Sequence, residues 1–211
     1  MNFKFTLFPS FVHAVRMLAL LMIVLFSTGT SAADRPNFLV IIADDMGFSD
    51  AGCYGGEIAT PHLDELAAGG LRFTQFYNTA RCWPTRAALM TGYYPQQVRR
   101  DGMPEASAIS GPRGKRPDWA LTIAERLQPA GYRTYHSGKW HIDGKPTEHG
   151  FDRSNSTVRG PGFFETIKKK DRDPNYYMTV GTAQHAIDCL QEHASKFSDR
   201  PFFHYLAFNA P

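Results

Sequence analysis

The chain has 211 residues, of which 43% are hydrophobic and 20% are charged, which is enough for one domain with a sizeable core. It carries 23 basic and 20 acidic side chains, for a net charge of +3. Two of the basic residues, Lys4 and Arg16, lie in the first 33 residues, so the rest of the chain is close to neutral. This balance argues against nucleic acid or another polyanion as a partner.

The first 33 residues have the layout of a signal peptide. Lys4 and Arg16 form a basic region, residues 17–26 form an uninterrupted apolar run, and residues 30–33 are small residues suited to cleavage. The apolar run is too short for the ~20 residues that a membrane-spanning helix needs. We therefore expect removal of residues 1–33, no stable membrane span, and export to the periplasm or the extracellular space. An uncleaved anchor that recruits residues 11–14 is the alternative.

Strand and helix signals then alternate, which predicts an α/β fold with a mostly parallel sheet flanked by helices. Short apolar, β-branched or aromatic runs predict strands at residues 38–43, 132–137 and 202–208. Capping and breaking residues predict helices between Thr60 and Gly69, from Thr85 to Thr91, between Thr122 and Pro129, and from Thr182 to Asp199. The first strand is apolar at every position, which is typical of a strand buried on both faces.

The last predicted helix has apolar residues at helical spacing, which predicts a core-facing stripe of Ala183, Ala186, Ile187, Leu190 and Ala194. Two segments rich in Gly, Pro and polar residues, 95–117 and 143–176, are predicted loops, and the second is interpreted as an insertion or substrate loop. Two basic runs, residues 113–116 and 168–170, fall inside these segments, so we expect solvated loops rather than a binding patch.

The chain has three cysteines, Cys53, Cys82 and Cys189. A disulfide scaffold is not expected, because the number is small and odd. Whether Cys53 and Cys189 form a pair is left open by the sequence.

Cys82 begins the pentapeptide Cys82-Trp83-Pro84-Thr85-Arg86. Pro84 suits the start of a helix, since its missing N–H is no loss there. Cys82 is thus expected just before a helix N-terminus, where backbone N–H groups favour an anion. This is a suitable place for a nucleophile that attacks an anionic substrate. The alternative is a buried structural cysteine.

Polar residues follow each predicted strand, and parallel strands place their carboxyl ends at one edge of the sheet. Asp44 and Asp45 are adjacent carboxylates that suit a hard divalent cation, or else form a simple turn. Lys139 could hold an anionic oxygen as a point charge, and His141 could move protons near neutral pH. The alternative is an exposed lysine and a structural histidine. Three further histidines near these motifs, His62, His136 and His204, are assigned to packing or to the rim of the site.

The order and spacing of these motifs resemble the sulfatase family. The motifs are residues 35–37 with the first strand and Asp44-Asp45, then 60–64, 82–86 with 89–92, 131–132 with 138–141, and finally 201–203 with 207–211. The resemblance implies the alkaline-phosphatase-like fold and an enzyme that hydrolyses sulfate esters, acting on a sulfated small molecule or a glycan. Which sulfate ester it takes is left open.

The same resemblance implies roles for six residues. Cys82 would be oxidised to Cα-formylglycine by a maturation enzyme and would become the nucleophile. Asp44, Asp45 and the modified Cys82 would bind a divalent metal, most commonly Ca²⁺, with Mg²⁺ as the alternative. Arg86 would hold the formylglycine, Lys139 would contact the sulfate, and His141 would hydrogen-bond the formylglycine.

Family members are usually more than twice as long, and some of their site residues would follow Pro211. Residues 34–211 are therefore interpreted as the N-terminal part of a sulfatase catalytic domain. We expect little or no sulfatase activity from the 211 residues expressed alone, and ordinary turnover of an aryl sulfate would contradict this. The competing hypotheses are a non-catalytic secreted remnant and a phosphate or phosphonate ester hydrolase of the same superfamily.

Overall fold

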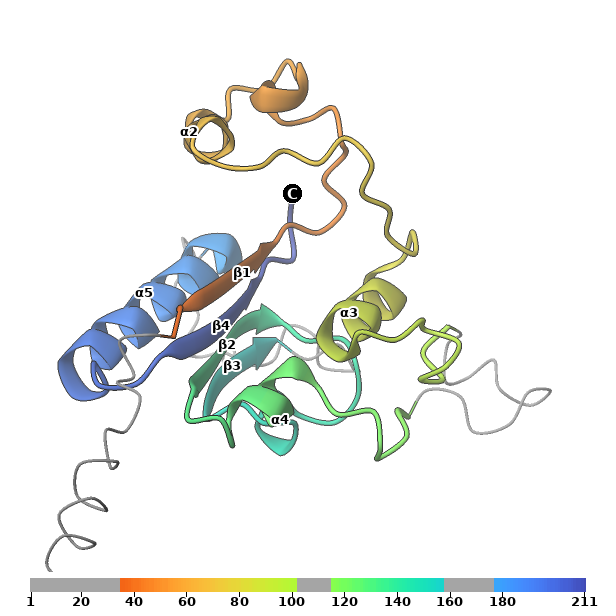
Figure 1. The fold of residues 1–211 in the computed structure, drawn as a ribbon. Helices are drawn as coiled ribbons and strands as arrows, with labels where there is room; N and C mark the ends of the chain where they lie inside the picture. Colours follow the sequence, from red (N-terminus) through yellow and green to blue (C-terminus); the bar gives the residue numbers. More distant parts are fainter. Residues whose placement is uncertain (1–34, 102–114, 158–176) are drawn as a thin grey trace, which may run out of the picture. The chain divides into compact units, whose positions relative to one another are not determined.

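The computed structural model describes residues 35–101, 115–157 and 177–211. Four strands form one sheet in the order β1-β4-β2-β3, and every neighbouring pair is parallel (Figure 1). The strands are β1 (Phe38–Ile42), β2 (Arg133–Lys139), β3 (Arg153–Thr157) and β4 (Phe202–Ala207). The predicted parallel α/β architecture is confirmed, and the carboxyl ends of all four strands lie at the same edge.

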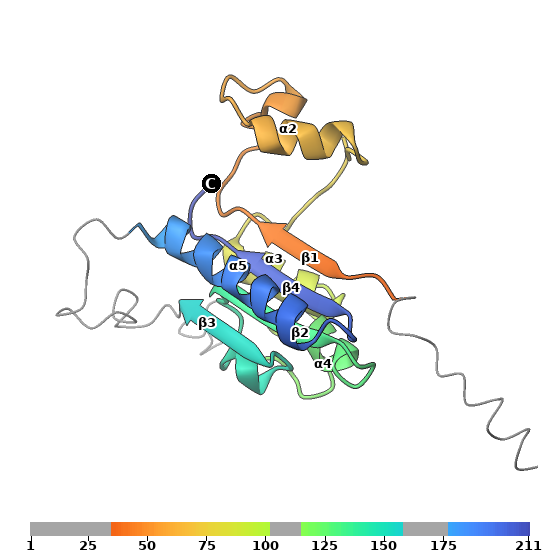
Figure 2. The same cartoon turned by 90° about the vertical axis from the view of Figure 1, so that its left-hand side faces the viewer.

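Helices cover both faces of the sheet (Figures 1 and 2). On one face, α3 (Cys82–Thr91) and α4 (Ile123–Leu127) pack against alternate residues of β4, namely Phe203, Tyr205 and Ala207. This layer holds most of the hydrophobic core. On the other face lies α5 (Met178–Lys196), which contacts β2 and β4.

The helix boundaries follow from local capping. Thr122 and Glu125 form the predicted capping box at the start of α4, and Gly92 ends α3 with φ 75°, in the left-handed region. The helix α2 (Pro61–Ala68) has Pro61 in its first turn. Its Asp64 side chain accepts the backbone N–H of Cys53, in η2 (Gly52–Tyr54), at 2.7 Å.

Two predictions of burial are wrong. β1 is not buried on both faces, because α5 packs on β2 and β4: Leu39 and Ile41, on that face, are 45% and 52% exposed, whereas Val40 and Ile42 pack against the core on the other. The predicted core stripe of α5 is wrong except at Ala186, which is buried as predicted, since Ile187 is 46% exposed. The other buried residues of α5 are Thr182, Cys189 and His193.

The buried face of α5 is polar because the sheet beneath it is polar. Ser137 Oγ lies 2.7 Å from His185 Nδ1 on the helix and 2.9 Å from His204 Nε2 on β4. The Tyr135 hydroxyl lies 3.2 Å from His193 Nδ1. Hydrogen bonds therefore decide which side of this helix turns toward the sheet.

Two segment boundaries also differ from the predictions. β2 continues to Lys139, so Gly138 and Lys139 end the strand rather than follow it. The predicted loop 143–176 contains the strand β3 and the short helix η4 (Pro146–Glu148). The predicted signal peptide, residues 102–114 and the lysine run at 168–170 lie outside the described residues. Within the described residues, no helix has the length and apolar character needed to span a membrane.

Acid should destabilise this sheet through two fully buried histidines. Burial lowers the pKa of His136 to about 3 and that of His204 to about 4. An unfolded histidine titrates near 6.5, so below that pH the unfolded state binds protons that the folded state excludes. Together, the two histidines should remove about 2.7 kcal/mol of unfolding free energy per pH unit between pH ~6 and ~4.

Urea unfolding at a series of pH values measures this slope. His136→Gln and His204→Gln should each reduce the measured slope by about 1.4 kcal/mol per pH unit, since each change removes one of these two groups. The exposed His62 is the matched control, and His62→Gln should leave the slope unchanged. Equal slopes in all four proteins would contradict the assignment.

Candidate active site

The strand ends bring the predicted site residues together. Beyond the last residue of β4, Phe208 N–H donates to Ile42 O at 2.9 Å, and Asp44 N–H donates to Ala210 O at 3.2 Å. The chain after β4 therefore runs beside the chain after β1. Lys139 reaches the same place from the end of the neighbouring strand β2.

Arg86 extends from α3 into this edge of the sheet and is only 1% exposed. Its Nη2 donates to Asp44 Oδ1 at 3.1 Å, and its Nη1 donates to Lys139 O at 3.0 Å and to the Tyr205 hydroxyl at 3.2 Å. A fourth acceptor, Phe208 O, lies 3.4 Å from Nη2. The planar guanidinium thus ties α3 to the ends of β1, β2 and β4.

Asp44 lies between two cations. Its second oxygen, Oδ2, accepts from the ammonium of Lys139, and Asp44 and Lys139 are both buried. Burial raises the pKa of Asp44, but hydrogen bonds and charge from Lys139 and Arg86 outweigh it, so the pKa is lowered. Asp44 is consequently an ionised, doubly paired carboxylate at neutral pH.

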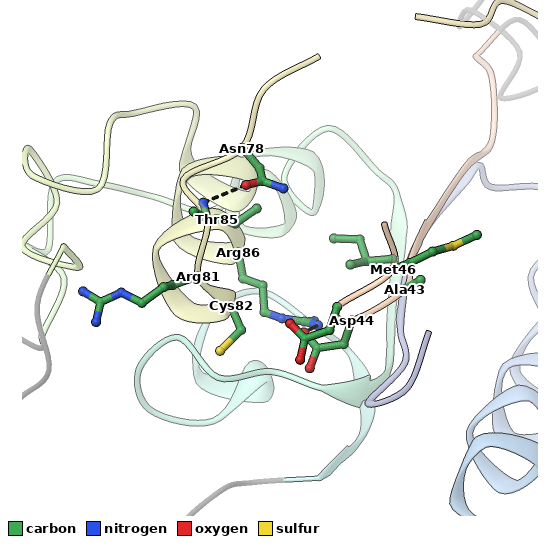
Figure 3. Close-up of a pocket in the computed structure, with 11 residues that line it drawn as sticks. Ala43, Asp44, Met46, Asn78, Arg81, Cys82, Thr85 and Arg86 are labelled. Atoms are coloured by element: carbon green, nitrogen blue, oxygen red, sulfur yellow. Dashed lines mark hydrogen bonds and ion pairs between the residues drawn. The ribbon is translucent and has the colours of Figure 1, made fainter. Parts of the chain in front are cut away.

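Cys82 is the first residue of α3 rather than the residue before the helix, since Arg81 is the N-cap. It is half-buried and lines a small pocket of about 150 Å³ together with Asp44, Asp45 and Arg86. Figure 3 shows Arg86 pointing from α3 toward Asp44, whereas Arg81 points away from them. The pocket therefore combines a thiol at a helix N-terminus with the ion pair beneath it.

His141 approaches the site from a turn after β2. Its ring meets the Trp83 ring edge-on, with centroids 5.5 Å apart. His141 has a φ of 54°, and Asp45 and Ala80, which line the pocket, have φ values of 61° and 57°. Left-handed backbone is uncommon outside glycine and costs about 1–3 kcal/mol per residue. Two of these conformations line the pocket and the third belongs to a residue packed against Trp83, and such clustering is a feature of functional sites.

The described residues include two donors of the type that a hard metal ion prefers. Asp44 and Asp45 offer the hard oxygen donors that Ca²⁺ and Mg²⁺ prefer. However, both oxygens of Asp44 already pair with Arg86 and Lys139. In the described part of the chain, no three or more His, Cys, Asp or Glu side chains are grouped so that they could hold a metal. The donors fit a hard divalent cation in type, but they fall short of the ~6–8 oxygens that Ca²⁺ takes.

The remaining sequence predictions have mixed outcomes. His136 and His204 are buried in packing positions, as expected, and His62 is exposed. Cys53 and Cys189 do not pair, and all three cysteines are free thiols. The solvated-loop prediction is wrong for Arg116, which is 5% exposed and forms ion pairs with Glu125 and Asp143.

Tyr205 is a site residue that the sequence analysis missed. Its hydroxyl accepts from Arg86, and burial raises its pKa, although Arg86 opposes the shift. A signal was present, because a tyrosine within an apolar strand needs a partner for its hydroxyl. Asn78 and Thr85 also line the pocket, and neither stands out in the sequence.

Comparisons with known proteins agree on one family. The sequence matches the Sulfatase family model over residues 36–211. It is 37% identical to the arylsulfatase of Klebsiella aerogenes, in an alignment that covers 92% of this chain and 46% of that protein.

Two solved structures give the same result. The crystal structure of Ps i-CgsB in complex with k-i-k-neocarrahexaose has a TM-score of 0.69 at 30% identity, over 84% of this chain and 45% of that one. The structure of BT4656 in complex with its substrate D-glucosamine-2-N,6-O-disulfate has a TM-score of 0.63 at 27% identity, over 84% and 35%. The chain spans less than half the length of each of these three proteins.

Proposed function

The chain belongs to the sulfatase family and has its alkaline-phosphatase-like fold, and on this basis we propose that the protein hydrolyses sulfate esters with a nucleophile made from Cys82. One observation carries the proposal. Cys82 lines the same pocket as Asp44 and Arg86, and Asp44 is paired with Lys139. All four are residues that the sequence motifs single out for this chemistry.

The residues around Cys82 suit a sulfate ester. The first turn of α3 directs free backbone N–H groups and the positive end of the helix dipole toward the pocket. Lys139 is a buried point charge that pairs with Asp44, and it can contact a sulfate oxygen. Arg86 donates to four acceptors at the strand ends, and these contacts fix the position of α3 and therefore of Cys82 beside them.

The nucleophile and its cofactor are part of the proposal. Cys82 is oxidised to Cα-formylglycine by a maturation enzyme, and the aldehyde adds water to form a hydrate. One hydroxyl attacks sulfur and expels the alcohol of the ester, and the second then loses its proton and expels sulfate, which restores the aldehyde. Asp44 and Asp45, with the modified Cys82, would hold a divalent cation, Ca²⁺ or alternatively Mg²⁺, which adds positive charge beside the ester. His141 is placed to assist proton transfer at the second step.

The substrate is a sulfated small molecule or a glycan. Binding of a sulfated glucosamine by BT4656 supports the glycan, and similarity to an arylsulfatase supports a smaller ester. We also propose that residues 1–33 are a signal peptide that exports the protein, and that residues 34–211 are the N-terminal part of the catalytic domain.

Turnover by the whole protein, coexpressed with a formylglycine-generating enzyme, tests the function. We expect hydrolysis of an aryl sulfate to exceed that of the matching aryl phosphate. Cys82→Ala should reduce the sulfatase rate about 10³-fold or more, because it removes the nucleophile. Faster hydrolysis of the phosphate would favour the phosphate ester alternative. If the matured protein hydrolyses neither ester, the result would favour the hypothesis of a non-catalytic remnant.

A further inference from the structure

A second ion-pair cluster lies next to the turn that carries His141. Its centre is Arg116, whose side chain is only 4% exposed. Arg116 Nε donates to Asp143 Oδ1 at 3.2 Å, Nη1 donates to Ala120 O and lies 3.4 Å from Glu125 Oε2, and Nη2 lies 2.7 Å from His149 Nδ1. One guanidinium therefore joins the start of α4 to the segment after β2.

The turn after β2 is closed by contacts on both sides of His141. The indole N–H of Trp140 donates to Asp143 O at 2.7 Å, which fixes the two ends of the turn. Ile142 is 5% exposed and belongs to the hydrophobic core. His141, between these anchors, is held at a φ of 54° with its ring against Trp83, the neighbour of Cys82.

Asp143 connects the ion-pair cluster around Arg116 to the turn of residues 140–143. Its backbone carbonyl accepts from Trp140, and its carboxylate, 8% exposed, accepts from Arg116. The His149 ring stacks on Trp140 with 20° between the planes, and its Nε2 lies 3.7 Å from Asp143 Oδ2. Because Arg116 donates to Nδ1 of this ring, the ring proton lies on Nε2 and faces Asp143.

Without Arg116, Asp143 and Glu125 would both lose the buried guanidinium that pairs with them. Asp143 would keep the charge of the buried Arg100 nearby but would lose Arg116 as a donor, and weakening the pairing of a buried carboxylate is unfavourable. Asp143 could regain water only by moving outward, and its carbonyl would then release the Trp140 indole. The left-handed conformation of His141 would no longer be supported, because strained backbone persists only where its surroundings fix it.

We propose that Arg116 is a positioning residue for His141, acting through Asp143 and the turn of residues 140–143. The role of His141 in the reaction rests on the proposed sulfatase function, whereas its position does not. Arg116 touches neither Cys82 nor the pocket beside it, so its effect on the site would be indirect.

Proton–carbon NMR of the histidine rings tests the positioning directly. The Trp83 ring should displace the His141 C–H signals from their ordinary shifts, and His141→Gln identifies these signals. We expect Arg116→Gln and Asp143→Ala to remove most of the displacement and Arg116→Lys to restore part of it. Arg126→Gln, at an exposed arginine of α4, is the control and should leave the His141 signals unchanged.

The buried His204, whose ring contacts Tyr135 on β2, reports whether the sheet is intact in each variant. An unchanged His141 signal in a folded Arg116→Gln protein would overturn the proposal. If Arg116→Gln does not fold, an unchanged His141 signal in Asp143→Ala would overturn the proposal instead. In the matured whole protein, Arg116→Gln should lower kcat about tenfold with KM within about twofold, since substrate contacts remain. Absence of turnover in the unsubstituted protein would count against the sulfatase function alone.

Discussion

Replacing Arg86 with methionine should destabilise the protein by about 3–5 kcal/mol, because it breaks a buried ion pair and leaves its partners without a donor. Methionine fills much of the same space, so the loss comes from the polar contacts. Asp44 would keep only Lys139, and the carbonyl of Lys139 and the hydroxyl of Tyr205 would lose Arg86 as a partner. Each buried group left unsatisfied adds to the cost.

Urea denaturation of Arg86→Met measures this loss. Arg126→Met, at an exposed position on α4, should change the unfolding free energy by no more than about 0.5 kcal/mol. Arg86→Lys should fall between the two, because lysine keeps the charge but cannot reach four acceptors with a planar fork. A loss below about 1 kcal/mol in Arg86→Met would show that the network contributes little.

Gly138→Ala should be nearly as damaging, for a steric reason. Gly138 has a φ of 94°, and a Cβ there would lie 2.1 Å from Ala207 O and 2.8 Å from Thr182 Cγ2. Ala207 is the strand partner of Gly138, so relief requires β2 and β4 to separate. We expect a loss of about 3 kcal/mol or more, from left-handed strain and overpacking together, and a displaced Lys139.

Gly92→Ala is the matched control for this prediction. Gly92 has a φ of 75°, but a Cβ there meets nothing within 4 Å. Its loss should be the left-handed strain alone, about 1–2 kcal/mol. The difference between the two variants therefore isolates the contact with Ala207. Equal losses in urea denaturation would contradict the steric explanation.

Much of the fold could be predicted because its signals are local. The runs at 38–43 and 202–208, the capping box of Thr122 and Glu125, and the left-handed Gly92 all depend on residues close in sequence. The meeting of Asp44 with Lys139 was also predictable, since parallel strands place their carboxyl ends together.

The missed features depend on contacts between distant residues. β3, with the sequence Arg-Ser-Asn-Ser-Thr, has no apolar alternation and forms by pairing with β2 at the edge of the sheet. The side of α5 that is buried is set by polar partners such as Ser137 and His204, which no helical pattern reveals. Arg116 lies in a basic run but is buried, because Glu125 and Asp143 meet it in space.

The chemical state of Cys82 tests the central claim most directly. The protein would be produced with and without a formylglycine-generating enzyme, and the peptide containing Cys82 would be analysed by mass spectrometry. We predict the aldehyde, which resists thiol alkylation and reacts with a hydrazide, in the first sample and the free thiol in the second. An alkylatable thiol in both samples would contradict a formylglycine nucleophile at Cys82.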